Sequence, residues 1–216
     1  MITVYGLQSP YVYRVRACLL QKNLPFQHFS VNMANRSERF KQLSPVGTIP
    51  VLEDDDGTAI CDSFHIALYL DEKYPHTYKM FGSNLRTKAK IFNILGLIDR
   101  IHQINGPLSY EKWGLIERFR QSGMSHRATL LDETQKADAK KDIAARLDKA
   151  TGLLGNNAFY TGSFSFADAA MLILITSLQS SGIDVGSWAE WKDSLMGDDK
   201  IAMMFTPKEE KGAGEI

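Results

Sequence analysis

Three short stretches of the sequence place polar or rigid side chains where strands and helices are expected to meet. In YGLQSPYVYRVR, Ser9 follows a short apolar run and Pro10 stands at the first position of a predicted helix. The backbone N–H groups and the dipole at a helix N-terminus favour an anion, to which the Ser9 hydroxyl can donate a hydrogen bond. The same two residues are also preferred for simply starting a helix, so the pattern leaves both interpretations open.

The other two stretches are LSPVGTIPVL and ICDSFHIALYL. A cis Ile49-Pro50 bond would turn the Ile49 N–H and C=O outward to pair with an extended, peptide-like ligand, whereas a trans bond would merely open the next strand. Asp62 and Ser63 lie between a predicted strand and a predicted helix. There the Asp62 carboxylate could hold an ammonium group, or it could serve as a plain N-cap.

The composition excludes several classes of protein. The 216 residues contain 25 Lys and Arg and 25 Asp and Glu. The chain therefore has no net positive charge that would indicate a nucleic-acid partner. Cys18 and Cys61 form no CxxC pair and the five histidines show no metal-ligand spacing, so we expect neither a disulfide framework nor a metal site. The longest apolar run, residues 169–175, is far shorter than a membrane span. We therefore expect a cytoplasmic protein with no membrane partner.

The first third of the chain alternates strand and helix patterns. Strands are expected at 2–6, 26–31, 50–53 and 58–61, and helices at 10–22, 36–43 and 63–74. The last two strands flank Asp-Asp-Asp-Gly, which predicts a hairpin. The order βαβαββα therefore predicts a small α/β domain whose mixed sheet has one parallel pair, an antiparallel edge and helices packed on it.

Beyond residue 76 the sequence shows helical patterns and no further strand. Residues 77–84 read as a linker. Apolar residues at helical spacing predict a long helix over 85–105, and composition predicts a second helix, with a charged face, over 134–154. Residues 165–181 are apolar all round and should form the central helix of this part. We therefore expect an all-α helical domain over 85–206, followed by a flexible tail over 207–216.

The order of these motifs resembles that of the cytosolic glutathione transferases. The resemblance runs from SPYVYRVRACLLQKNLPF through SPVGTIPVL and CDSFHIALYLDEKYP to YTGSFSFADAAML, and it is densest over residues 3–75. In the last segment, Ser165 and Asp168 match the S/T-x-x-D capping box of the family, a motif that serves folding rather than chemistry. The resemblance implies a thioredoxin-like domain over 1–76, with glutathione as co-substrate and no metal.

The resemblance also implies a role for each candidate residue. Ser9 occupies the position that, in serine-type members, donates a hydrogen bond to the glutathione sulfur and so stabilises the thiolate, which is the nucleophile. Ile49 and Pro50 would pair with the cysteinyl unit of glutathione, while Asp62 and Ser63 would hold its γ-glutamyl end. The loop SPVGT, which precedes Pro50, contains no Lys or Arg to bind the glycyl carboxylate.

A small hydrophobic electrophile would, by the same resemblance, bind in a cleft between the two domains. Tyr11, Tyr13, Tyr110 and Trp113 are candidates to line that cleft, although an aromatic residue at helical spacing is more often part of a core. The resemblance further implies a role in detoxification and a homodimer in which the N-terminal domain of one subunit lies against the helical domain of the other. The sequence does not identify the electrophile.

Three kinds of function are therefore considered. Conjugation of glutathione to an electrophile fits Ser9, and a glutathione-dependent isomerase or dehalogenase is a close variant of it. Thiol–disulfide reduction, as in omega and lambda relatives, would require a cysteine in place of Ser9. A non-catalytic binding or assembly module would be expected to have lost Ser9, Asp62 and Ser63. The Ser-Ser-Cys run of zeta members is absent here, which argues against maleylacetoacetate isomerase activity.

Overall fold

The chain divides into two compact units. The computed structural model describes residues 1–121 and 124–206. The first unit comprises Met1–Ser83 together with a segment that begins at Leu195, and the second comprises Asn84–Ser194. The elements of the first unit, in chain order, are β1 (Ile2–Gly6), α1 (Pro10–Gln21), β2 (Phe26–Ser30), α2 (Glu38–Leu43), β3 (Val51–Glu53), β4 (Ala59–Cys61), α3 (Ser63–Lys73) and α9 (Asp199–Met203). The predicted order βαβαββα is confirmed, and it forms a thioredoxin-like domain.

The four strands form one mixed sheet in the order β2-β1-β3-β4. β1 and β2 are joined through a helix and are parallel, while β3 runs antiparallel to both β1 and β4. The β3–β4 hairpin turns at Gly57, whose φ of 84° lies in the left-handed region that glycine adopts without strain. Both the parallel pair and the antiparallel edge agree with the sequence-based expectation.

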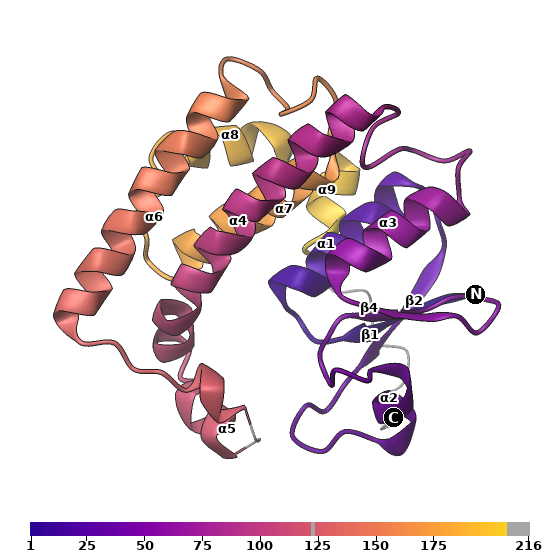
Figure 1. Ribbon diagram of the computed structural model, residues 1–216, viewed down its shortest axis with the longest axis horizontal. Coiled ribbons are helices and arrows are strands. Elements are labelled where there is room, and N and C mark those ends of the chain that lie inside the picture. Colours follow the sequence, from indigo (N-terminus) through magenta and orange to yellow (C-terminus); the bar gives the residue numbers. More distant parts are fainter. Residues whose placement is uncertain (122–123, 207–216) are drawn as a thin grey trace. The chain divides into compact units, whose positions relative to one another are not determined.

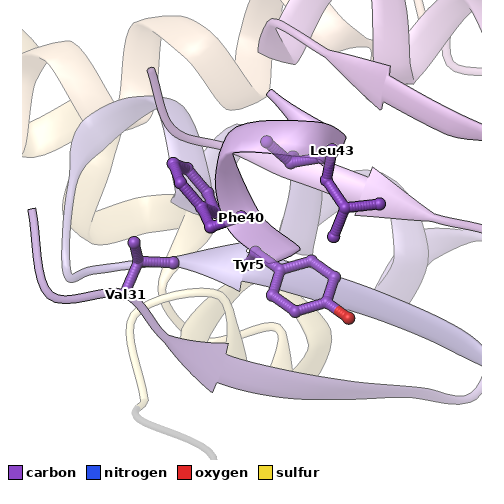
Figure 2. Close-up of a cluster of buried hydrophobic side chains, with 5 residues drawn as sticks. Tyr5, Val31, Phe40 and Leu43 are labelled. Carbon is purple, nitrogen blue, oxygen red and sulfur yellow. The ribbon is translucent and has the colours of Figure 1, made fainter. Parts of the chain in front are cut away.

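Helices cover both faces of this sheet (Figure 1). Helix α1 packs so closely on β1 that a Cβ at Gly6 would lie 2.5 Å from Cγ2 of Val12, so this position requires glycine. On the other face, Tyr5 and Val51 of the sheet pack with Val31 and with Phe40 and Leu43 of α2 (Figure 2). Burial of these apolar side chains fixes the strand ends from which the candidate site is built.

The segment after α3 belongs to the first unit instead of forming a free linker. Lys22 and Asp71 form a buried ion pair with 2.6 Å between Nζ and Oδ1. The Asp71 carboxylate also accepts hydrogen bonds from the N–H groups of Met80 and Phe81, at 3.1 and 3.0 Å. These contacts hold residues 77–83, which the sequence suggests are a linker, against α1 and α3.

The second unit is helical throughout its described residues. Its elements are α4 (Leu85–Lys112), α5 (Ile116–Gln121), the 3-10 helix η1 (Ser125–Arg127), α6 (Glu133–Leu154), α7 (Phe166–Ser180) and α8 (Trp188–Leu195). Helix α7 is buried along most of its length and packs against α4, as expected of a central helix that is apolar all round. None of the helices described here has both the length and the apolar character needed to cross a bilayer.

The capping box of α7 is built from its own first turn. Asp168 is completely buried, and its carboxylate accepts hydrogen bonds from the Ser165 N–H at 2.8 Å and from the Ser165 hydroxyl at 2.5 Å. Its other oxygen accepts from the Tyr160 N–H at 2.9 Å. Burial nevertheless dominates and raises the pKa of Asp168 to about 6. The motif therefore ties the loop before α7 to the start of that helix.

The structure departs from the sequence-based expectation in three places. Helix α4 continues to Lys112, through Pro107, whereas the periodicity predicted its end near residue 105. Helices α5, α8 and α9 were not predicted, because each spans only five to eight residues. Residues 195–206 belong to the first unit instead of the helical domain, because α9 packs on α1. The predicted tail, 207–216, lies outside the described residues.

Candidate functional site

The three stretches singled out in the sequence meet at one edge of the sheet. Tyr5 of β1 lies opposite Val51 of β3, which in turn lies opposite Cys61 of β4. Because β3 is antiparallel to both neighbours, β1 and β4 end at the edge where β3 begins. Ser9, Ile49, Pro50, Asp62 and Ser63 lie within three residues of those strand ends, and together they define what we call the sheet-edge site.

Ser9 is the N-cap of α1. Its backbone is extended, with φ of −142° and ψ of 152°, and its Oγ accepts a hydrogen bond from the Val12 N–H at 3.3 Å. Pro10 then occupies the first turn of the helix. A hydroxyl that accepts through its oxygen still has its own proton to donate. Ser9 can therefore cap the helix and donate to a bound anion at the same time, so the two interpretations of this residue are compatible.

The Ile49-Pro50 peptide bond is cis. Pro50 is buried, and the half-buried Ile49 side chain packs against the apolar cluster under α2. The side chain of Ile49 is thus used for packing, which leaves its backbone as the part that can address a ligand at this edge.

Asp62 joins β4 to α3 in an unusual backbone conformation, with φ of 72° and ψ of 131°. Its carboxylate caps α3 by accepting from the Phe64 N–H at 2.9 Å, and it lies 3.9 Å from Nδ1 of His65. The side chain is 58% exposed, so the carboxylate caps the helix and still faces solvent. Ser63, in contrast, is buried at the first position of α3.

A basic residue that the sequence reasoning missed lies beside the loop before Pro50. The half-buried Arg36 donates a hydrogen bond from Nη1 to the carbonyl oxygen of Gly47 at 2.8 Å. The loop itself contains no Lys or Arg, so its own sequence gives no sign of a cation. Arg36 lies 11 residues earlier, just before α2, so only the fold brings its charge to this loop.

The four aromatic candidates fall in different units. Tyr11 and Tyr13 lie on α1 in the first unit, and both are half-buried. Tyr110 and Trp113 lie at the end of α4 in the second unit. Tyr110 packs edge-on against Phe119 with 4.8 Å between the ring centroids, whereas Trp113 is 42% exposed. Each pair therefore belongs to its own unit.

The two cysteines differ in their surroundings. Cys18 is buried within α1, where desolvation raises its thiol pKa. Cys61 is half-buried, with its Sγ 3.4 Å from the carbonyl oxygen of Leu43. Burial therefore keeps the Cys18 thiol protonated, a state that does not favour attack by its sulfur.

Among the described residues, Asp54, Asp55 and Asp56 of the hairpin turn form a group of potential metal ligands within 4.8 Å of one another. Asp54 accepts hydrogen bonds from the hydroxyls of Tyr69 and Tyr74, both at 2.8 Å, and Asp56 pairs with Lys73. These contacts hold the hairpin to α3, which accounts for the acidic cluster.

Comparison with known proteins shows similarity to glutathione S-transferases. Residues 5–78 match the family model "Glutathione S-transferase, N-terminal domain". Glutathione S-transferase Z1 from Arabidopsis thaliana is 42% identical over 94 residues, which is 42% of this chain and 42% of that protein. Maleylacetoacetate isomerase from Pseudomonas aeruginosa is 34% identical over 79 residues, or 34% of this chain and 37% of that protein. The chain therefore matches less than half the length of these curated relatives.

The solved structures extend the similarity to both units. A glutathione S-transferase from Rhodospirillum rubrum superimposes with a TM-score of 0.77 over 96% of this chain and 93% of that one, at 22% identity. At this level of identity the likeness establishes a shared fold.

Proposed function

Because this chain belongs to the glutathione transferase family, we propose that it binds glutathione at the sheet-edge site and that Ser9 stabilises the thiolate for attack on a hydrophobic electrophile. The position of Ser9 is the observation that carries the proposal. It lies at the N-terminus of α1, where the hydroxyl proton, the backbone N–H groups and the helix dipole all favour a negative charge. The thiol of glutathione bound there should lose its proton at a lower pH than the thiol of free glutathione, and the resulting thiolate is the reactive form.

The rest of the site matches the charges of glutathione. The Asp62 carboxylate supports binding of the γ-glutamyl ammonium group, since it is exposed and its position is fixed by its hydrogen bond to the Phe64 N–H. The Ile49 backbone would pair with the cysteinyl unit, and Ser63 at the start of α3 would contribute to the γ-glutamyl subsite. We assign the glycyl carboxylate to Arg36, the cation that lies against the loop before Pro50.

A glutathione-dependent isomerase is the second candidate, favoured by the similarity to maleylacetoacetate isomerase. Both reactions begin with the addition of a glutathione thiolate to an electrophilic carbon. In conjugation the product keeps the new C–S bond, whereas in isomerisation that bond breaks again after rotation and glutathione is released. Product analysis separates the two: consumption of glutathione in step with the electrophile supports conjugation, and unchanged glutathione supports isomerisation.

The proposal is tested by titrating the thiolate absorbance of bound glutathione against pH. In the wild-type protein the thiol pKa should lie below that of free glutathione, and in Ser9→Ala it should return toward the free value. Turnover of an electrophile by Ser9→Ala should fall by ~10²-fold, the loss expected for one anion-stabilising donor. Glutathione that binds without a lowered thiol pKa would instead support a non-catalytic module.

A matched control separates the chemistry from helix capping. Ser37 caps α2 in the same unit by accepting from the Phe40 N–H at 3.1 Å. Ser37→Ala should cost about 1 kcal/mol of stability, as should Ser9→Ala, because both remove a serine cap. Only Ser9→Ala should change the thiol pKa. A similar change in both variants would assign the effect to loss of a cap and would refute the role of Ser9.

A further inference from the structure

One face of α1 connects the sheet-edge site to the C-terminal part of the first unit. Ser9, Tyr13 and Arg16 are spaced i, i+4 and i+7, so they form one stripe along the helix. The Tyr13 N–H donates to the Ser9 carbonyl oxygen at 3.0 Å, which places the two residues on successive turns. Ser9 therefore lies about 6 Å, or one helical turn, from Tyr13.

Residues 198–206, which we call the C-terminal strap, lie on this stripe. Arg16 is only 3% exposed, and its Nη2 donates to the carbonyl oxygens of Met203, at 3.1 Å, and of Thr206. These are the carbonyls at and just after the end of α9, where backbone acceptors have no partner within the helix. The strap also buries Ile201 and Met204. Arg16 thus holds the end of the strap against α1 by two hydrogen bonds, which an apolar side chain cannot form and of which lysine can keep at most one.

The strap places an aromatic ring beside Tyr13. Phe205 packs edge-on against Tyr13, with ring centroids 5.6 Å apart and an interplanar angle of 64°. The guanidinium carbon of Arg16 lies 6.0 Å from the same Tyr13 ring. Phe205 is half-buried, so part of its ring is still accessible to a ligand. The result is an apolar wall of two rings, one from each end of the unit's sequence, one turn along α1 from Ser9.

We infer that Phe205 is a specificity-determining residue that contacts the electrophile, and that Arg16 is the positioning residue that holds it beside Tyr13. This inference rests on the proposed function, because it needs a glutathione sulfur at Ser9. A substituent on that sulfur extends away from the peptide and meets the nearest apolar surface. Within the first unit, the Tyr13 and Phe205 rings offer such a surface beside the Ser9 end of α1.

The test compares the binding of glutathione and S-hexylglutathione by titration calorimetry, so that it needs no turnover. In wild-type protein the hexyl conjugate should bind more tightly than glutathione, because the alkyl chain is removed from water against the two rings. Phe205→Ala should reduce this preference by about tenfold, while the dissociation constant of glutathione itself changes less than about twofold. Met203→Ala is the matched control, since this side chain is exposed on the same strap; its preference should equal that of wild type.

The role of Arg16 is tested through the same comparison of the dissociation constants of glutathione and S-hexylglutathione. Arg16→Met should lose the preference for the hexyl conjugate, and Arg16→Lys should restore part of it, because lysine can still donate to one carbonyl. The inference would be overturned if Phe205→Ala left the preference for the hexyl conjugate unchanged. It would also be overturned if Met203→Ala reduced that preference as much as Phe205→Ala does. Equal weakening of both ligands in Phe205→Ala leaves the ratio of their dissociation constants unchanged and therefore also overturns the inference, whereas Phe205→Leu, which keeps an apolar side chain, should retain part of the hexyl preference. Failure of wild type to bind either ligand would instead refute the proposed function from which the inference starts.

Discussion

At the level of single residues, Asp62 caps a helix and also presents an exposed charge. Its positive φ of 72° is uncommon for a residue other than glycine and costs on the order of 1–3 kcal/mol. The carboxylate caps α3 through the Phe64 N–H. Asparagine tolerates such a backbone and keeps the capping oxygen, so Asp62→Asn removes the charge and little else.

We therefore predict that Asp62→Asn keeps a near-wild-type urea midpoint but binds glutathione about tenfold or more weakly, the loss expected when a charge-assisted hydrogen bond becomes neutral. Titration calorimetry measures the affinity. Glu38→Gln serves as the control, because Glu38 is an exposed carboxylate of the same unit that pairs with Lys41 on α2. Unchanged affinity in Asp62→Asn would mean that another group binds the ammonium.

At the level of elements, the start of α7 makes stability depend on pH. Asp168 has an ordinary pKa of 3.8 when unfolded and a pKa of about 6 when buried in the native state. Between these values the native carboxyl binds a proton that the unfolded chain lacks. The resulting contribution favours the native state below about pH 4 and is lost as pH rises through about 6. The shift corresponds to roughly 3 kcal/mol.

We predict that the contribution of Asp168 to the pH dependence of stability disappears in Asp168→Asn. The free energy of unfolding of the wild type, minus that of the variant, should fall by roughly 3 kcal/mol between pH 4 and pH 7. Tryptophan fluorescence is the appropriate signal, because Trp113, Trp188 and Trp191 all lie in the second unit. Ser165→Ala retains the titrating carboxylate and should keep the pH dependence, extended to higher pH because loss of the Ser165 hydroxyl raises the Asp168 pKa further; a parallel pair of curves for wild type and Asp168→Asn would show that Asp168 does not titrate in this range.

The same scale shows why some features could be predicted from sequence and others could not. Turn residues and strand–helix alternation predict the βαβαββα unit, because these signals are local. Helix α4 continues beyond the end that periodicity predicted near residue 105, because packing against α6 and α7 outweighs the hydrogen bond that Pro107 removes. Arg36 and the strap depend on contacts across 11 and 187 residues, respectively, which periodicity cannot reveal. Ser9 and Asp62 could be proposed from the sequence because their motifs are contiguous.

At the level of the whole molecule, association with a second copy is the remaining proposal. Equal numbers of acidic and basic residues, 25 of each, mean that net charge does not oppose self-association. Helix α4 exposes Leu85, Ala89, Phe92 and Gly96 at the spacing i, i+4, i+7 and i+11, which forms one apolar stripe. Leu85 is 84% exposed and Phe92 is 40% exposed, so the stripe presents apolar surface to solvent.

We therefore predict a homodimer that uses this stripe of α4. Light scattering should give a mass near twice 24.3 kDa, and the double variant Leu85→Glu with Phe92→Glu should shift it toward the monomer value, because charges buried in an apolar interface are costly. Leu130→Glu with Leu153→Glu is the control, since both leucines are exposed elsewhere in the second unit. A monomeric wild type would reject the homodimer, whereas a dimer that survives the α4 substitutions would place the interface on another surface.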